Sequence, residues 1–188
     1  MNNPQINKHP QMSRASLEVL TPVSVMDEKG QRKEVEITGE RPLTLYVDKQ
    51  EIVTLMTLGG HPELLTLGYL YNQGFIQNLR EIRSVQVDWD VEASVVTTYD
   101  GIKDIKERLG RRTVTTGCGQ GTVYGSILEN LETVQLPKVR LSQSLFYRLL
   151  HRIRDYNDVY KRSGAVHACA LCRNDEVVDF IEDVGRHN

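Results

Sequence analysis

Apolar and polar residues alternate along much of the first hundred positions of this 188-residue chain, a pattern that predicts β-strands. Val35 and Ile37, for example, alternate with Glu34 and Glu36, the period of a half-exposed strand. Turn-forming residues separate the alternating segments. We expect strands on both sides of a turn at 27–30, a hairpin at 43–58 with its turn at 48–50, and two further strands at 84–90 and 93–99.

Two longer segments have the period of a helix instead. The first begins near Pro62, where the missing N–H of proline costs little, and ends near Gly74. The second begins after Ser142, a good N-cap residue, and ends at Gly164. The apolar stripe expected on the first helix consists of Leu64, Leu67, Leu70 and Tyr71. Short helices are also expected at 102–109 and 123–131.

The last part of the chain has small apolar residues followed by a charged end. Residues 165–172 are small and apolar throughout, which predicts a strand buried on both faces, and residues 177–183 follow as another strand. The whole pattern predicts an α/β (α+β) protein. Its expected parts are a disordered lead-in at 1–13, a β-rich subdomain at 14–110, a mobile glycine-rich loop at 111–122 and an α/β subdomain at 123–188.

Composition narrows the class of protein. Lys+Arg number 23 and Asp+Glu 25, for a net charge of −2, so charge gives no case for binding nucleic acid or an anionic membrane. No apolar run approaches the roughly 20 residues of a membrane span, and the N-terminus does not resemble a signal peptide. Three widely placed cysteines argue against a disulfide framework. We therefore expect a cytoplasmic protein with reduced thiols.

Cys118 is the first candidate for chemistry. It lies between Gly117 and Gly119 in the segment TVTTGCGQGT, and several close glycines predict a mobile segment whose thiol can reach out of the protein. Two arginines just upstream and free backbone N–H groups would favour the reactive thiolate. Two interpretations stay open at this point: a functional thiol, or a cysteine that merely lies in a flexible loop.

Cys169 and Cys172 form a C-x-x-C, a spacing that suits zinc or a redox dithiol. On a strand, however, residues three apart point to opposite faces, and no second C-x-x-C completes a four-ligand site. Two small buried core cysteines are the simpler interpretation, and we expect no metal site. His167, on the same strand, would by itself be a hydrogen-bonded core histidine.

The charged end, Glu182 to Asn188, contains two carboxylates, a guanidinium and an imidazole directly after an apolar strand. The ends of strands are where α/β proteins place ligand contacts. The alternative is that these residues form a solvated strand exit without a ligand.

Together these segments resemble the formate dehydrogenase accessory sulfurtransferases, the FdhD/NarQ family. The resemblance covers nearly all of the chain after the lead-in. The matching segments are ERPLTLYVDKQEIVTLMTLGGHPELLTLGYLYNQGFI (40–76), TTGCGQGT (115–122), SGAVHACAL (163–171) and EDVGRHN (182–188).

This resemblance implies a cytoplasmic sulfurtransferase with a cytidine-deaminase-like C-terminal subdomain that works as a homodimer. It would take persulfide sulfur from a cysteine desulfurase and pass it to the molybdenum bis-guanine dinucleotide cofactor of formate dehydrogenase. Cys118 would be the catalytic sulfur carrier. The resemblance places the cofactor contacts at Thr116, Gly117, His167, Glu182, Asp183, Arg186 and His187. A non-catalytic chaperone that binds the cofactor for formate dehydrogenase is the alternative.

Two departures from the family pattern modify this expectation. Many members have a C-x-x-C in the loop, whereas Gly121 stands at the second position here, which favours a single sulfur carrier. Members usually continue beyond G-R-H-N, so we expect a C-terminal subdomain truncated at Asn188. A zinc deaminase is disfavoured, because Cys169 stands where H-x-E would place the catalytic glutamate.

Overall fold

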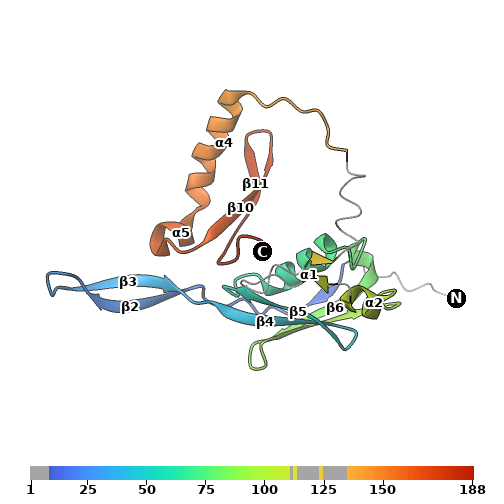
Figure 1. The fold of residues 1–188 in the computed structure, drawn as a ribbon. Helices are drawn as coiled ribbons and strands as arrows, with labels where there is room; N and C mark the ends of the chain where they lie inside the picture. Colours follow the sequence, from blue (N-terminus) through green and yellow to red (C-terminus); the bar gives the residue numbers. More distant parts are fainter. Residues whose placement is uncertain (1–8, 111, 114–122, 125–134) are drawn as a thin grey trace.

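A five-stranded sheet forms the core of the computed structural model, which describes residues 9–110, 112–113, 123–124 and 135–188 (Figure 1). The strand order is β1-β6-β7-β4-β5. The bounds are β1 Gln11–Met12, β4 Arg41–Val47, β5 Gln50–Thr57, β6 Ile82–Asp88 and β7 Ala93–Thr98. The β4/β5 and β6/β7 pairs are antiparallel, whereas β4 pairs with β7 and β1 with β6 in parallel. The hairpin and the two strands expected from alternation are confirmed.

Helix α1 (Pro62–Asn72) covers one face of this sheet (Figure 1). Leu67 and Leu70 of the helix pack with β-strand residues into a single apolar cluster, and Thr66 donates a buried hydrogen bond to Ser94 of β7 at 2.8 Å. The expected apolar stripe is only half right. Leu64 and Tyr71 are 47% and 57% exposed, because α1 turns the side that contains Thr66, Leu67 and Leu70 to the sheet.

The segment 13–19, which we call the N-terminal arm, is tied to α1 and β6. The buried carboxylate of Glu63 accepts hydrogen bonds from the Ser13 hydroxyl at 2.7 Å and the Ala15 amide at 2.9 Å. The Trp89 indole donates to the carbonyl of Ala15 at 2.6 Å. Strand β1 lies before the arm, so the disordered lead-in expected over 1–13 extends too far along the chain. Pairing with β6 orders residues 11 and 12.

A second hairpin projects away from the sheet (Figure 1). It consists of β2 (Leu20–Met26) and β3 (Arg32–Thr38), and its turn is the one expected at 27–30. The Asp27 carboxylate closes the turn by accepting from the amides of Lys29 and Gln31, each at 2.9 Å.

Short elements connect the sheet to the rest of the chain. They are η1 (Leu79–Glu81), α2 (Ile105–Gly110), β8 (Arg112–Thr113) and β9 (Val123–Tyr124). Helix α2 overlaps the short helix expected at 102–109 but begins three residues later and ends one residue later. The helix expected at 123–131 is wrong at its first two residues, which pair with β8, and its remainder lies outside the described residues.

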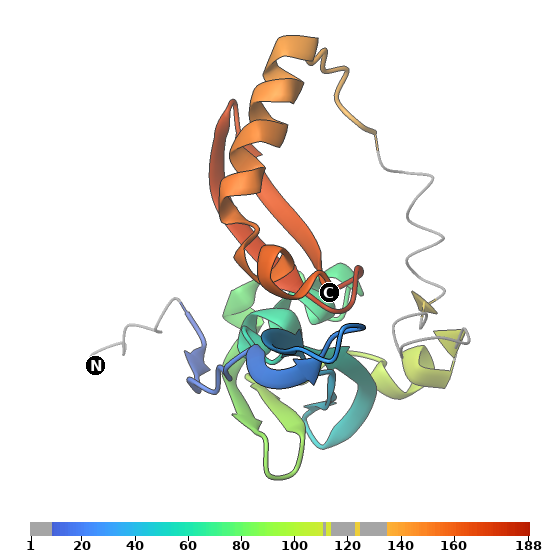
Figure 2. The ribbon, with the colours of Figure 1, turned by 90° about the vertical axis from the view of Figure 1, so that its left-hand side faces the viewer.

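The C-terminal part consists of two helices and a hairpin: α4 (Gln143–Tyr156), α5 (Asp158–Ser163), β10 (His167–Arg173) and β11 (Glu176–Asp183). Ser142 caps α4 as expected, accepting from the amide of Leu145. The expected single helix is broken at Asn157, and Gly164 ends α5 with φ 69°. Figure 2 shows the hairpin and α4 standing side by side above α1.

Strand β10 is mainly exposed, so the prediction of a strand buried on both faces is wrong. Its antiparallel partner is β11, and α4 packs on β11, where the Tyr156 and Phe180 rings lie 5.6 Å apart. Neither Cys169 nor Cys172 is buried, and His167 is exposed, so none of the three is a core residue here. The small apolar residues of β10 predicted burial, but no other described element covers most of this strand.

Candidate functional site

The charged end of the chain folds back onto the corner between β5 and α1. Asp183 makes this junction: one carboxylate oxygen accepts from the Thr57 hydroxyl at 2.6 Å, and the other accepts from the Leu58 amide at 3.1 Å and the Val184 amide at 2.6 Å. Thr57 is itself almost fully buried. Asp183 therefore holds the turn that follows β11 against the N-terminal sheet.

Asn188 makes a second attachment at the same corner. Its side-chain amide donates to the carbonyl of Met56 at 2.9 Å, and its backbone amide donates to the carbonyl of Gly185 at 3.0 Å. A Cβ at Gly185 would lie 2.8 Å from the side-chain amide nitrogen of Asn188, so a larger residue there would displace that side chain. Arg186 and His187, between the two attachments, are exposed to solvent.

Glu182 points the other way, to the first turn of α5. Its two carboxylate oxygens accept from the backbone amides of Val159 at 3.0 Å and Tyr160 at 2.9 Å. These N–H groups have no partner within the helix, and a carboxylate at this end also suits the helix dipole. Glu182 and Asp183 thus connect the hairpin to the elements on either side of it.

A cleft of about 670 Å³ lies between α1 and the β10–β11 hairpin. From the α1 side it is lined by His61, Leu64, Leu65, Gly68, Tyr69, Asn72 and Gln73. From the other side it is lined by Cys169, Leu171, Asp179, Phe180, Ile181, Glu182, Asp183, His187 and Asn188. The structure thus brings three of the expected site residues, Glu182, Asp183 and His187, to one cleft, and leaves His167 and Arg186 outside its lining.

The cysteine pair does not converge. Cys169 lines the cleft, Cys172 does not, and a register shift separates Leu171 from Cys172. Within the ranges that the structure describes, no group of three His, Cys, Asp or Glu side chains is arranged to hold a metal ion.

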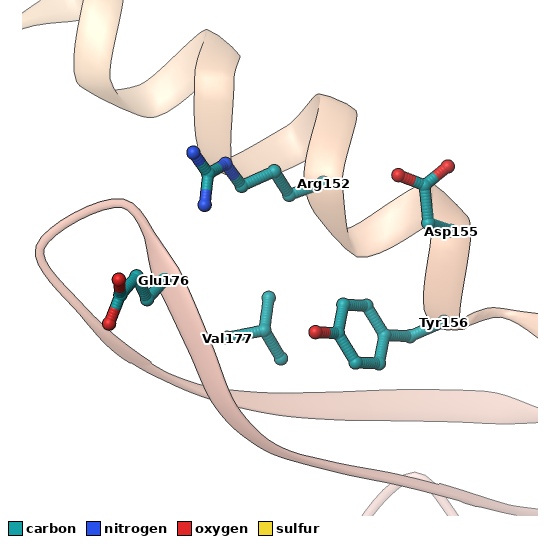
Figure 3. A pocket seen from close by; sticks show the side chains of 5 residues that line it. All are labelled: Arg152, Asp155, Tyr156, Glu176 and Val177. Atoms are coloured by element: carbon teal, nitrogen blue, oxygen red, sulfur yellow. The ribbon is translucent and has the colours of Figure 1, made fainter.

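A second hollow, of about 560 Å³, lies between α4 and the start of β11 (Figure 3). Arg152 and Tyr156 point from the helix toward the hairpin, facing Glu176 and Val177 (Figure 3). The Arg152 guanidinium also contacts Asp175 in the hairpin turn at 3.3 Å. Three of its lining residues, Arg152, Asp155 and Glu176, are charged and exposed to solvent.

Three expected site residues, Cys118, Thr116 and Gly117, lie outside the described residues. Sequence reasoning also missed the α1 side of the cleft and the role of Thr57. One signal was available for Thr57: it is a polar residue at the end of the apolar strand β5, directly before Leu58 and two glycines.

The fold is mixed α/β, with sheets that dominate and few helices, and its cleft lies where the C-terminal hairpin meets the first helix. Residues 38–188 match the model of the FdhD/NarQ family, and the chain belongs to this family. The described residues include no helix that is long and apolar enough to cross a membrane.

Similar proteins include the sulfur carrier protein FdhD of Listeria monocytogenes, 29% identical over 167 residues, which are 86% of this chain and 64% of that protein. The sulfur carrier protein FdhD of Sulfurisphaera tokodaii is 28% identical over 81% of this chain and 58% of its own length. A candidate formate dehydrogenase accessory protein from Desulfotalea psychrophila has a similar fold, with a TM-score of 0.59 and 21% identity. The match covers 90% of this chain and 64% of that structure. The chain thus spans somewhat under two thirds of these relatives.

Proposed function

We propose that this protein carries sulfur for the maturation of formate dehydrogenase, with a persulfide on Cys118 as the carried group. The observation that supports this proposal best is the alignment of 86% of the chain with a protein named sulfur carrier protein FdhD. Cys118, between two glycines, is the residue whose chemistry suits that role. The donor is a cysteine desulfurase, and the acceptor is the molybdenum bis-guanine dinucleotide cofactor of formate dehydrogenase.

The first step is a thiolate attack. The Cys118 thiolate attacks the terminal sulfur of the donor's persulfide, a new S–S bond forms on Cys118, and the donor cysteine leaves as a thiolate. In the second step the terminal sulfur passes to the metal of the cofactor, which is the substrate here. The S–S bond on Cys118 breaks, Cys118 leaves as a thiolate, and the metal supplies the two electrons that convert the sulfur to sulfide.

The geometry separates four of the expected cofactor contacts into two pairs. Arg186 and His187 are exposed at the turn after β11 and can contact a ligand, and the Arg186 guanidinium suits the cofactor's phosphates. Glu182 and Asp183 already accept hydrogen bonds from backbone and hydroxyl donors, so we assign them the role of positioning that turn. His167, Thr116 and Gly117 stay as proposed contacts.

The cleft between α1 and the hairpin does not suit the phosphates. Its described lining contains Asp179, Glu182 and Asp183 but no lysine or arginine. Phosphate groups need cations or free backbone N–H groups. We therefore propose that the cofactor's charged part lies outside this cleft, at Arg186.

Mass spectrometry tests the proposal directly. The protein is incubated with a cysteine desulfurase and cysteine, and Cys118 is expected to gain one sulfur atom that a reductant removes. Cys118→Ala should abolish the gain while the far-UV circular dichroism stays unchanged, and Cys172→Ala is the matched control that should keep it. If Cys118 gains no sulfur while the protein still binds guanosine diphosphate, the chaperone function replaces sulfur transfer.

The cellular setting belongs to the same proposal. A persulfide carrier needs a reduced thiol, which the cytoplasm maintains. We propose that the protein acts there as a homodimer and binds both the desulfurase and formate dehydrogenase. Light scattering during size-exclusion chromatography tests the dimer, and a single monomer mass at all concentrations would contradict it.

A further inference from the structure

Helix α1 has an unusual outer surface for a helix that covers a sheet. Its inner side packs in the core, yet Leu64 on the outer side is 47% exposed. Across the cleft, Leu171 of β10 is 63% exposed. The apolar lining of the cleft therefore extends to the solvent-exposed surface on both sides of the cleft. A ligand that covered both leucines would be larger than the cavity itself.

The cleft runs along the helix. The α1 residues that line it recur as the pairs 64/65, 68/69 and 72/73, one pair every four residues. Rows of side chains at this spacing form the ridges and grooves into which a second helix packs. Eight residues of helix correspond to about 12 Å, a little over two turns of such a partner.

Gly68 lies in the middle of this row. Glycine in a helix interior is destabilising, so we expect a structural reason for its presence at this position. Packing against other elements is not that reason, because a Cβ at Gly68 would have no heavy atom within 4 Å apart from its chain neighbours and the backbone of its own helix. The missing side chain leaves open space in the cleft lining, where the backbone of a partner can approach closely.

Charge narrows the chemistry of the partner. Asp179, Glu182 and Asp183 line the cleft, and its described lining includes no lysine or arginine. The exposed Asp179 carboxylate accepts only from the neighbouring amide of Phe180 among the hydrogen bonds described, so it can also pair with a cation from outside. A ligand with phosphate groups is disfavoured here, and a basic one is favoured.

We propose that this cleft is a docking groove for an amphipathic helix of a partner protein, with leucine-type side chains facing Gly68 and Leu171 and lysine or arginine beside Asp179. Helix-in-groove recognition of this kind uses apolar anchors spaced three and four residues apart. The inference does not depend on sulfur transfer, because none of these groups takes part in the chemistry of Cys118.

Fluorescence anisotropy with designed peptides tests the groove. The probe is a labelled amphipathic helical peptide of about 18 residues with leucines on one face and lysines beside them. A second peptide carries glutamate in place of each lysine, and a third has the same composition with the leucines spaced every second residue. The lysine peptide is expected to bind saturably, and at least about tenfold more tightly than either of the others.

Substitutions in the chain locate the binding. Gly68→Leu fills the open space and should weaken binding at least about tenfold, although leucine favours the helix and should leave the fold intact. Asp179→Lys should reverse the preference between the lysine and glutamate peptides. Leu171→Ser should weaken binding, whereas Leu150→Ser, at an exposed leucine of α4 outside the cleft, is the matched control that should not.

Three results would overturn the proposal. The first is that the lysine peptide does not bind saturably. The second is that it binds Gly68→Leu as tightly as the unchanged protein. The third is that guanosine diphosphate displaces the peptide and that Gly68→Leu no longer binds the nucleotide. The last result would make the cleft a nucleotide site. Sulfur loading of Cys118, followed by mass spectrometry in the same Gly68→Leu variant, separates failure of the docking groove from failure of the proposed function.

Discussion

At the scale of single residues, the two adjacent carboxylates at the end of β11, Glu182 and Asp183, form hydrogen bonds within the protein. Acidic residues after a strand predict ligand contacts, but both side chains are already engaged within the protein. Asp183 is hydrogen-bonded to Thr57 and Leu58 in the N-terminal sheet, and Glu182 to the first turn of α5. Their position next to Arg186 and His187 therefore sets where those exposed side chains stand.

Removing the Asp183 carboxylate should detach this turn. Asp183→Ala leaves the Leu58 amide and the Thr57 hydroxyl without an acceptor, and hydrogen bonds to a charged group contribute about 1.5–3 kcal/mol each in such settings. We expect the amides of Leu58 and Val184 to lose protection in hydrogen exchange followed by NMR, while the amides of β6 and β7 keep theirs.

Asp179→Ala is the matched control on the same strand. Its exposed carboxylate accepts only from the amide of the next residue among the hydrogen bonds described, so protection of Leu58 should not change. Unchanged exchange at Leu58 in Asp183→Ala would show that the turn is held in another way.

At the scale of elements, an ion pair connects the projecting β2–β3 hairpin to the C-terminal helix α5. The Arg162 guanidinium of α5 donates to both carboxylate oxygens of Glu36 in β3, from Nε at 2.6 Å and from Nη2. Arg162 also donates to Asp158, one helical turn earlier, at 3.1 Å. The hydrogen bond from Arg162 lowers the pKa of Glu36 below its ordinary value of 4.5 and raises the pKa of Arg162.

This pair predicts that the contact weakens in acid. Because the pKa of Glu36 is depressed in the folded protein, the stabilisation is complete above pH 4.5 and is lost as the pH falls through the lowered value. We expect the Arg162 Nε–H resonance to move toward that of a free arginine as the pH is lowered from neutrality through the lowered pKa of Glu36.

Glu36→Gln tests the assignment. The neutral amide should place the Arg162 resonance near the free position already at neutral pH and remove its titration in the acid range. The Arg162 side chain is exposed and that of Glu36 is partly exposed, so salt should weaken the contact as well. A resonance that titrates unchanged in Glu36→Gln would assign the effect to Asp158 instead.

At the scale of the whole molecule, apolar burial is concentrated in the N-terminal part. The hydrophobic cluster lies between Leu43 and Val96, whereas helices α4 and α5 have no buried residue. The C-terminal hairpin and α4 are held by surface contacts, among them the pair of Arg152 with Asp175. Stability should therefore differ between the two parts of the chain.

Hydrogen exchange followed by mass spectrometry should show that difference. Amides of β4, β5 and β7 are expected to exchange slowest, and those of α4 and of the β2–β3 hairpin much faster, because few buried apolar contacts oppose their local opening. Addition of a helical partner that occupies the cleft should slow exchange in α1 and β10 selectively. Protection in α4 equal to that in β4 would contradict the distribution of burial described here.

Much of the fold could be predicted from local patterns. The turns at 27–30 and 48–50 and the caps at Ser142 and Gly164 were predicted correctly. The strands expected at 84–90 and 93–99 are present as β6 and β7, although β6 begins and ends two residues earlier than expected. Each depends on residues within a few positions, since alternation, turn chemistry and capping are local. The break at Asn157 was missed, because apolar spacing continues through it from α4 to Tyr160.

Predictions that depended on distant partners succeeded less often. Residues 11 and 12 join the sheet through β6, some seventy residues away, and no local pattern signals a two-residue strand in parallel pairing. Burial was overestimated for β10, where the composition suits a core but nothing described covers it. The expected cofactor contacts stay predictions: Glu182, Asp183 and His187 line one cleft, and Cys118 lies outside the described residues.

By itself the sequence determined the family, the strands and turns, and a thiol between glycines whose chemistry suits a sulfur carrier. Only the tertiary structure decided that Asp183 bonds to Thr57, that Arg186 and His187 are exposed beside it, and that Gly68 leaves space in a cleft with a carboxylate lining. The physical reason is the distance along the chain between the residues that interact. Periodicity and turn chemistry depend on neighbouring residues, whereas hydrogen-bond partners, burial and cavities depend on which distant segments meet.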